Sequence, residues 1–321
     1  MSDDPFDCFG SDIEDENDDD SSQHQEDSNI KTKGTDLDPT KRDEESCGVL
    51  AFHANTERSL LMHVKNSFNS NSNGNIDNTK QQNDLLPCQR VLKEIDWYCS
   101  SRHWMMCVGP EKGEIIQNSL QEALDDKLQL MQSSESGHYK FVAVELGTYC
   151  GYGSIFLSSM LKTNDNQKRF PHIDFNLFTV EINPEYSSVA REMIQIAQLD
   201  DIITVLDNDL MMDGSTGDVG ELIKTNMVEK FGPESETMGI DFLMIDHDKD
   251  SYLADLKRLE LSGLIRRGTI VAADNVIFAG IYEYIDYMKG LDQEGIVKTC
   301  TREASVEYSP TEQLLKDGVG M

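Results

Sequence analysis

The chain has 321 residues and a formal net charge of −31, from 59 acidic and 28 basic side chains. That length is enough to bury a sizeable core in one large domain or two small ones. A strongly negative protein repels phosphate backbones, so nucleic acid is not expected as a partner. No apolar run approaches the roughly 20 residues of a membrane span, so no membrane segment is expected either.

Acidic residues are concentrated at the amino terminus. Residues 1–47 hold seventeen Asp and Glu against four Lys and Arg, a charge of −13 that leaves −18 for the rest of the chain. With almost no aliphatic side chains to offset chain entropy, residues 1–55 are expected to form a disordered acidic tail. Such a tail favours solubility or weak contacts with basic partners. One folded domain is expected over residues 56–321.

The cysteines indicate a reducing environment. They are odd in number, scattered and without a CxxC pair, so neither a disulfide framework nor a zinc site is expected. The chain also does not start with the basic and then apolar pattern of a secretory signal. A cytoplasmic location is therefore expected. The seven residues are Cys8, Cys47, Cys88, Cys99, Cys107, Cys150 and Cys300.

The first part of the domain has helical patterns. A short helix is predicted over 57–64, followed by a flexible insertion rich in Asn, Ser and Gln at about 66–84. Apolar residues then recur at helical spacing in 88–102 and again in 113–131. Two helices are thus expected before the first strand.

Short apolar runs then alternate with helical patterns. This alternation is typical of a Rossmann-like α/β fold, with a doubly wound, mostly parallel sheet and flanking helices. Ligands of such sheets bind at the carboxyl ends of the strands, so the residues just after each strand are candidate site residues. Strands are predicted at 141–146, 177–182, 202–206, 241–245 and 269–273, and helices at 154–161, 184–197, 219–230 and 252–261.

The first predicted strand runs into a glycine-rich turn, which reads ELGTYCGYG from Glu145 to Gly153. Glycines let the backbone turn tightly and approach a ligand closely. The GxxxGxG spacing differs from the dinucleotide pattern GxGxxG, and no Walker lysine is present. The turn therefore favours S-adenosylmethionine (AdoMet) over NAD or a nucleoside triphosphate. A purely structural strand-to-helix turn is the alternative.

The second predicted strand ends at Glu181. A carboxylate is an acceptor only, and at this position it can take hydrogen bonds from both hydroxyls of a ribose. A surface glutamate without such a role is the more common reading of this position when it is taken alone.

Acidic and amide side chains directly follow the fourth and fifth strands. Asp246, Asp274 and Asn275 would offer three hard oxygen ligands from adjacent strand ends, a set that suits Mg²⁺. The run DHDKD at 246–250 resembles the start of an EF-hand loop, but Ser251 stands where that loop requires glycine. A solvated acidic loop is the remaining alternative.

Taken together, these segments resemble the catechol O-methyltransferase family. The resemblance runs from residue 57 to about residue 315 outside the insertion, with a longer connection than is usual at 211–239. It implies AdoMet- and Mg²⁺-dependent transfer of a methyl group to one hydroxyl of a small catechol-type diol. The matching segments are RHWMMCVGPEKG at 102–113, VELGTYCGYG at 144–153, TVEINPEY at 179–186, MIDHDKDSYLADL at 244–256, GLIRRGTIVAADNV at 263–276 and SVEYSP at 305–310.

The resemblance also implies roles in metal binding and proton transfer. The matching positions place magnesium on Asp246, Asp274 and Asn275. Lys249, three residues after the first aspartate, would be the general base. Glu307, just before a tyrosine near the carboxyl terminus, would grip the second hydroxyl of the diol.

Further contacts with cofactor and substrate are implied in the same way. Trp104 and Met106 correspond to apolar walls around the ring and the reacting methyl group, and the alternative is that both are core residues. Lys249, Asn275 and Glu307 would also contact the substrate. The implied cofactor contacts are Val108, Glu145, Gly147, Tyr149, Glu181, Ile182, Asp246 and His247.

Five positions depart from the family pattern. Asp248 stands where the family has a tryptophan that packs on adenine, and Gly153 stands where it has a serine. Asp209-Leu210 replaces a Ser-Gln pair, and Ala279 replaces a proline beside the substrate. Two alternative functions therefore stay open. They are a methyltransferase for another phenolic or hydroxylated metabolite, and a binding protein that kept the fold and lost catalysis.

Overall fold

The domain that carries the candidate site is described from Asn55 onward. Nearly all of the predicted tail lies outside the described residues, as do residues 71–84 of the predicted insertion, so both stay predictions. Within the described part of the chain, none of the helices combines the length and apolar composition needed to span a bilayer. The computed structural model describes residues 55–70, 85–132, 138–208, 217–277, 279–305 and 316–321.

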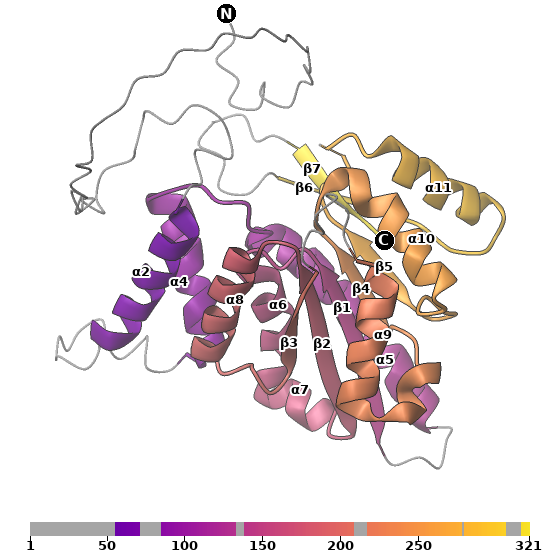
Figure 1. Cartoon of the computed structure of the whole chain (residues 1–321), viewed down its shortest axis with the longest axis horizontal. Helices are drawn as coiled ribbons and strands as arrows, with labels where there is room; N and C mark the ends of the chain where they lie inside the picture. Colours follow the sequence, from indigo (N-terminus) through magenta and orange to yellow (C-terminus); the bar gives the residue numbers. More distant parts are fainter. Residues whose placement is uncertain (1–54, 71–84, 133–137, 209–216, 278, 306–315) are drawn as a thin grey trace, which may run out of the picture. The chain divides into compact units, whose positions relative to one another are not determined.

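A single mixed sheet lies at the centre of this domain (Figure 1). Its described strands are β1 (Tyr139–Leu146), β2 (Ile173–Glu181), β3 (Ile203–Asp207), β4 (Phe242–Ile245), β5 (Ile270–Ala273), β6 (Thr301–Ser305) and β7 (Lys316–Gly320). They follow the order β3-β2-β1-β4-β5-β7-β6. The first five in this order pair in parallel, while β7 and β6 pair antiparallel at one edge. The expected Rossmann-like, mostly parallel sheet is confirmed.

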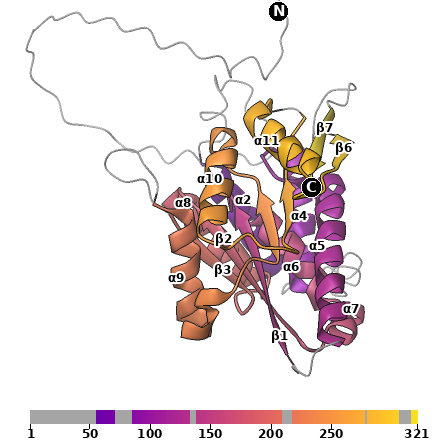
Figure 2. The ribbon, with the colours of Figure 1, turned by 90° about the vertical axis from the view of Figure 1, so that its right-hand side faces the viewer.

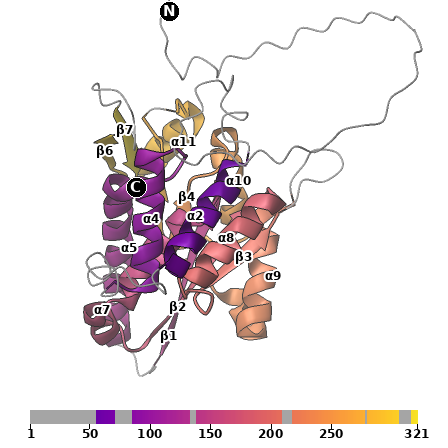
Figure 3. The same cartoon turned by 90° about the vertical axis from the view of Figure 1, so that its left-hand side faces the viewer.

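Helices cover both faces of the sheet, as the two edge-on views show (Figures 2 and 3). The α-helices are α2 (Thr56–Ser70), α4 (Pro87–Ser101), α5 (Gly109–Gln132), α6 (Tyr152–Ser159), α7 (Asn164–Arg169), α8 (Pro184–Ile196), α9 (Val219–Phe231), α10 (Tyr252–Leu261) and α11 (Tyr282–Gln293). The short 3₁₀ helices are η2 (Met160–Lys162), η3 (Pro233–Thr237) and η4 (Lys249–Ser251). One apolar cluster joins one face of the sheet to α2, α4, α5, α6 and α8, and a second joins the other face to α9, α10 and α11.

The two-sided burial explains why the central strands were visible in the sequence. In β1, Phe141 and Ala143 pack with the first cluster while Val142 and Val144 pack with the second. A strand buried on both faces is apolar at successive positions rather than at alternate ones. Helix α8 also begins at a capping residue. The Asn183 side chain accepts a hydrogen bond from the first turn of α8 at 2.9 Å.

The five strands and the helices predicted from the sequence are confirmed, with ends that differ by a few residues. Helix α2 is longer than predicted and runs to Ser70, so its last turn occupies positions that were expected to begin the insertion. Helices α7 and α11 and the antiparallel pair of β6 and β7 were not predicted.

Strand register brings the candidate residues together at the carboxyl end of the sheet. Leu146 pairs with Ile245, and Ile245 pairs with Ala273, so β1, β4 and β5 end side by side. Leu146 also pairs with Val180 near the end of β2. Strands β2 and β4 lie on opposite sides of β1, so the direction of the strand order changes there. Doubly wound sheets bind their ligands at the carboxyl ends of the strands beside such a change.

Candidate active site

Two aspartates lie at neighbouring strand ends. Asp246 directly follows β4 and Asp274 directly follows β5. The backbone continues the sheet pattern through both, because the Asp246 amide donates to Leu146 and the Asp274 amide donates to Ile245, each at 2.9 Å. The structure therefore brings together two carboxylates that are separated by a whole helix in the sequence.

Asp274 is buried, with only 1% of its surface exposed. Its Oδ2 accepts a hydrogen bond from the Lys112 ammonium at 2.8 Å, and its Oδ1 accepts one from the Asn275 amide at 2.7 Å. Burial raises the pKa of Asp274 to about 6, the nearby charge of Asp246 acts in the same direction, and Lys112 opposes both. A buried carboxylate beside a second carboxylate attracts a positive charge.

Asn275 has a left-handed backbone conformation, with φ of 58°. Asparagine is among the few residues other than glycine that adopt this region readily. The conformation turns the chain sharply after β5, and it holds the third predicted metal ligand at the strand end beside Asp274. A β-branched residue would be strained here.

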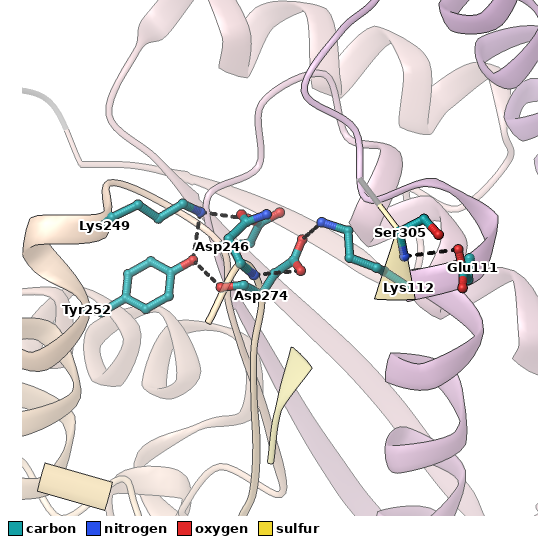
Figure 4. Close-up of polar contacts among 8 residues, drawn as sticks. Glu111, Lys112, Asp246, Lys249, Tyr252, Asp274 and Ser305 are labelled. Carbon is teal, nitrogen blue, oxygen red and sulfur yellow. Dashed lines mark hydrogen bonds and ion pairs between the residues drawn. The ribbon is translucent and has the colours of Figure 1, made fainter. Parts of the chain in front are cut away.

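Lys249 lies beside Asp246 and is held by two hydrogen bonds (Figure 4). Its Nζ donates to Asp246 Oδ1 at 3.1 Å and to the Tyr252 hydroxyl at 2.8 Å. The Tyr252 hydroxyl in turn donates to the Asp274 carbonyl at 3.2 Å, and Tyr252 is completely buried. The lysine is thus linked to both strand ends, while 31% of its side chain stays exposed.

His247 is held between two partners. Its ring stacks on Tyr252 with centroids 5.2 Å apart and planes 9° apart, and its Nε2 is 2.9 Å from Asp255 Oδ2. Burial alone would raise the pKa of Asp255, but the hydrogen bonds and charges of His247 and Arg258 outweigh it and lower the pKa. The histidine therefore has a fixed orientation next to the aspartate that follows β4.

The glycine turn after β1 makes a close approach that only glycine allows. Gly147 has φ of 99°, and a Cβ there would overlap the backbone carbonyl of Asp246. The turn therefore packs directly against the strand end that carries the first aspartate. The glycine turn and the two aspartates therefore lie at the same end of the sheet.

Glu145 lies behind the turn and is almost fully buried. Its Oε2 accepts hydrogen bonds from the hydroxyls of Ser154 and Thr179, the latter at 2.6 Å. Burial raises the pKa of Glu145 to about 8, although both hydroxyls oppose the shift. A Cβ at Gly153 would overlap Glu145 Oε1. The glycine that replaces the family's serine therefore leaves room for this carboxyl group.

Glu181 ends β2 and is held by backbone amides. Tyr149 donates to its Oε2 at 2.8 Å, while Ile182 and Asn183 donate to its Oε1 at 3.1 and 3.0 Å. Burial raises its pKa, and these amides oppose the rise. Carboxylate oxygens have further lone pairs, so they can also accept hydrogen bonds from a ribose. Tyr149 is itself left-handed, with φ of 46°, and its hydroxyl donates to Glu57 at 3.0 Å.

Four further residues predicted for the site differ in how exposed they are, and a fifth lies outside the described residues. Trp104 is half-buried and Met106 is 47% exposed in the segment between α4 and α5, where the fully buried core residue is Met105. Val108 is buried, and Ile182 is 40% exposed. Glu307 lies outside the described residues, so its role stays a prediction.

Lys112 and Tyr252 were not predicted as site residues. Lys112 lies in the first part of α5, a segment whose sequence indicates only a helix, and Tyr252 begins α10. Neither directly follows a strand, which is the position that marked the aspartates. Both lie in matching segments of the family pattern, Lys112 in 102–113 and Tyr252 in 244–256.

The donor set at the strand ends differs from a cluster of charged ligands. Among the residues that the structure describes, no group of three or more His, Cys, Asp and Glu side chains is arranged to hold a metal ion. The donors at the ends of β4 and β5 are instead two carboxylates and the side-chain amide of Asn275. Hard oxygen donors of this kind suit Mg²⁺, which keeps several waters and seldom takes an all-protein cage.

The sequence matches methyltransferases in comparisons with known proteins. A family described as a methyltransferase domain matches residues 144–276, from β1 to just after β5. Catechol O-methyltransferase B of Danio rerio is 32% identical over 231 residues, which are 72% of this chain and 72% of that protein. Catechol O-methyltransferase of Mus musculus is 31% identical over 202 residues, which are 63% of this chain and 62% of that protein.

The matches among solved structures are more distant in sequence. An O-methyltransferase from Bacillus cereus, solved in complex with SAH, has a TM-score of 0.39 and 19% identity, covering 70% of this chain and 94% of that one. The sequence match with the Danio rerio protein extends over most of both chains. The protein belongs to the catechol O-methyltransferase family of methyltransferases.

Proposed function

We propose that this protein transfers the methyl group of AdoMet to one hydroxyl of a catechol-type diol held on Mg²⁺. The observation that carries the proposal is the link between Lys249 and both strand ends, directly to Asp246 and through Tyr252 to Asp274. A base and two metal-type ligands in one hydrogen-bonded unit are what this reaction needs.

The residues present suit a magnesium ion. Asp246, Asp274 and Asn275 supply oxygen donors from two adjacent strand ends, and the charge of Asp246 already perturbs the buried Asp274 carboxyl. Two carboxylates this close favour a cation between them. A bound Mg²⁺ would supply positive charge that favours the ionised form of a diol hydroxyl. The same residues would then limit how that diol can lie.

Lys249 would take the proton from the hydroxyl that becomes methylated. For this it must be neutral when the substrate is present, and its hydrogen bonds to Asp246 and Tyr252 hold Nζ near the strand ends. The ionised oxygen would attack the sulfonium methyl in line, so the protein contributes mainly alignment. Glu307 would orient the second hydroxyl, and Trp104 and Met106 would border the ring.

AdoMet would lie across the glycine turn. Gly147 lets the turn pack against the end of β4, where a Cβ would overlap the Asp246 carbonyl. Glu181 at the end of β2 would accept hydrogen bonds from the ribose hydroxyls. Asp246 and His247 border the turn from β4. The remaining proposed contacts are Val108, Glu145, Tyr149 and Ile182.

The test uses the full chain with AdoMet, MgCl₂ and a panel of catechols, monophenols and other hydroxylated metabolites, with product detected by mass spectrometry. We expect a monomethylated catechol that disappears in EDTA and with Asp246→Ala. Calorimetry with AdoMet alone is the companion measurement. Metal-dependent methylation of another hydroxyl class would overturn the catechol assignment, and absence of AdoMet binding would overturn the whole proposal.

A further inference from the structure

Helix α5 carries the buried Lys112 and the largely buried Lys127, which pair with buried aspartates at opposite ends of the sheet. Lys112 Nζ lies 2.8 Å from Asp274 Oδ2, with 5% and 2% of the two side chains exposed. Lys127 Nζ lies 2.9 Å from Asp241 Oδ1, with 12% and 6% exposed. The lysines are fifteen positions apart, or roughly 22 Å along a helix, which spans the sheet from end to end.

The two aspartates differ in what surrounds them. Asp241, just before β4, also accepts hydrogen bonds from the Tyr139 hydroxyl at 2.8 Å and the Val142 amide at 2.9 Å. Its partners therefore all belong to α5 and β1. Asp274, just after β5, lies beside a second carboxylate, that of Asp246. The site end therefore has two negative charges, and their cationic partners among the described residues are Lys112 and Lys249.

Lys112 approaches from the side opposite Lys249, as Figure 4 shows. The Lys112 side chain is buried, so replacing the Asp274 carboxylate by water as the partner of its ammonium would cost free energy. The neighbouring Glu111 accepts the Ser305 amide at 3.2 Å, which ties this turn of α5 to β6. The position of the ammonium is thus set by the fold.

We propose that Lys112 is a built-in counter-ion for the divalent-cation site, which holds the Asp274 carboxylate in place and offsets its charge when no metal is bound. This inference rests on the proposed function, because it assigns Asp274 to a metal ligand set. Lys112 is a positioning residue in this scheme. It acts on the metal through Asp274.

A merely structural ion pair would stabilise the fold to the same extent with and without a divalent cation. Removal of Lys112 leaves two neighbouring carboxylates with too little positive charge, and a divalent cation supplies what is missing. The loss of stability caused by Lys112→Met should therefore depend on the metal. Lys127→Met removes the matched pair at the other end of the sheet, and its effect should not depend on the metal.

The experiment measures the melting temperature of the full chain in EDTA and in saturating MgCl₂, without substrate or AdoMet. We expect wild type to gain stability in MgCl₂. Lys112→Met should melt lower than wild type by roughly 6 °C or more in EDTA, and MgCl₂ should at least halve that difference. Lys127→Met should show the same loss in both buffers.

A second variant covers the case in which Lys112→Met does not fold in EDTA. The double variant Lys112→Met with Asp274→Asn removes both charges, so it should fold in EDTA and gain nothing from MgCl₂. Equal losses for Lys112→Met in EDTA and MgCl₂ would overturn the inference and leave the proposed function standing. A wild type with no response to MgCl₂ in melting or calorimetry would overturn both.

Discussion

The two ends of the sheet use the same residue types for different purposes. At the amino end, Asp241 accepts hydrogen bonds from Lys127, Tyr139 and a backbone amide, all within the framework. At the carboxyl end, Asp274 has Lys112 and one backbone amide and lies beside a second acidic residue. A buried carboxylate with a complete set of protein partners stabilises the fold, whereas one placed next to another carboxylate is prepared for an additional cation.

Left-handed backbone occurs at both ends of the sheet, since Gln198 precedes β3 and Gly268 precedes β5 at the amino end. The left-handed residues Gly147, Tyr149 and Asn275 all lie in the turns that follow β1 and β5. Turns of this kind bring the chain back over the strand ends. Strained or left-handed residues that persist in a fold tend to gather where a ligand is held. What distinguishes the carboxyl end is that its left-handed turns lie beside two neighbouring carboxylates.

The largest expected effect comes from Lys249, the proposed base at the carboxyl end. Lys249→Met should lower kcat by about 10² to 10⁴, because a positioned general base contributes that much to a proton transfer. AdoMet binding by calorimetry should be little changed. Lys257→Met, on the exposed side of α10, is the matched control and should keep normal kcat. A Lys249→Met enzyme within tenfold of wild type would show that another group takes the proton.

Stability at the carboxyl end should depend on pH through Glu145. Its pKa is raised from 4.5 to about 8, so the folded protein binds a proton that the unfolded chain has released. The contribution of this group is complete below about pH 4.5 and is lost as pH rises through about 8. Within that window, unfolding free energy should fall by about 1.4 kcal/mol per pH unit from this group alone.

Urea denaturation between about pH 5 and pH 8 checks this slope. Glu145→Gln should remove the contribution, because the amide does not titrate. Glu229→Gln, at an exposed position of α9, should leave it unchanged. Identical slopes for wild type and Glu145→Gln would contradict the assignment.

A smaller kinetic effect is expected from the hydroxyl that links the two strand ends. Tyr252→Phe removes the acceptor for Lys249 and the donor to the Asp274 carbonyl while it keeps the buried ring. We expect kcat to fall by about tenfold with KM for the diol almost unchanged, in line with the loss of one positioned hydrogen bond. A change confined to KM would place this hydroxyl in substrate binding instead.

The smallest effect is expected at the amino end. Tyr139→Phe removes one hydrogen bond to Asp241, and Lys127 and the Val142 amide remain as partners. We expect unfolding free energy to fall by about 1 kcal/mol with kcat unchanged. Urea denaturation and steady-state kinetics on the same preparation check both parts. A drop in kcat would show that the two ends of the sheet are coupled.

Local sequence patterns determined the five parallel strands and the acidic residues that follow them. A strand buried on both faces must be apolar at successive positions, and a charged residue directly after such a run must lie at its end. Alternation with helices then indicates that the strands are parallel, which places Glu181, Asp246 and Asp274 at the carboxyl end of the sheet. These inferences need only short segments and a general rule of topology.

The tertiary structure decided what those residues contact. Lys112 reaches Asp274 across a separation of 162 residues, and the edge pair of β6 and β7 lies next to β5 through antiparallel pairing. Such contacts depend on strand order and on how α5 packs across the sheet. No local periodicity records them, because the free energy of a buried ion pair comes from the surroundings that the whole fold provides.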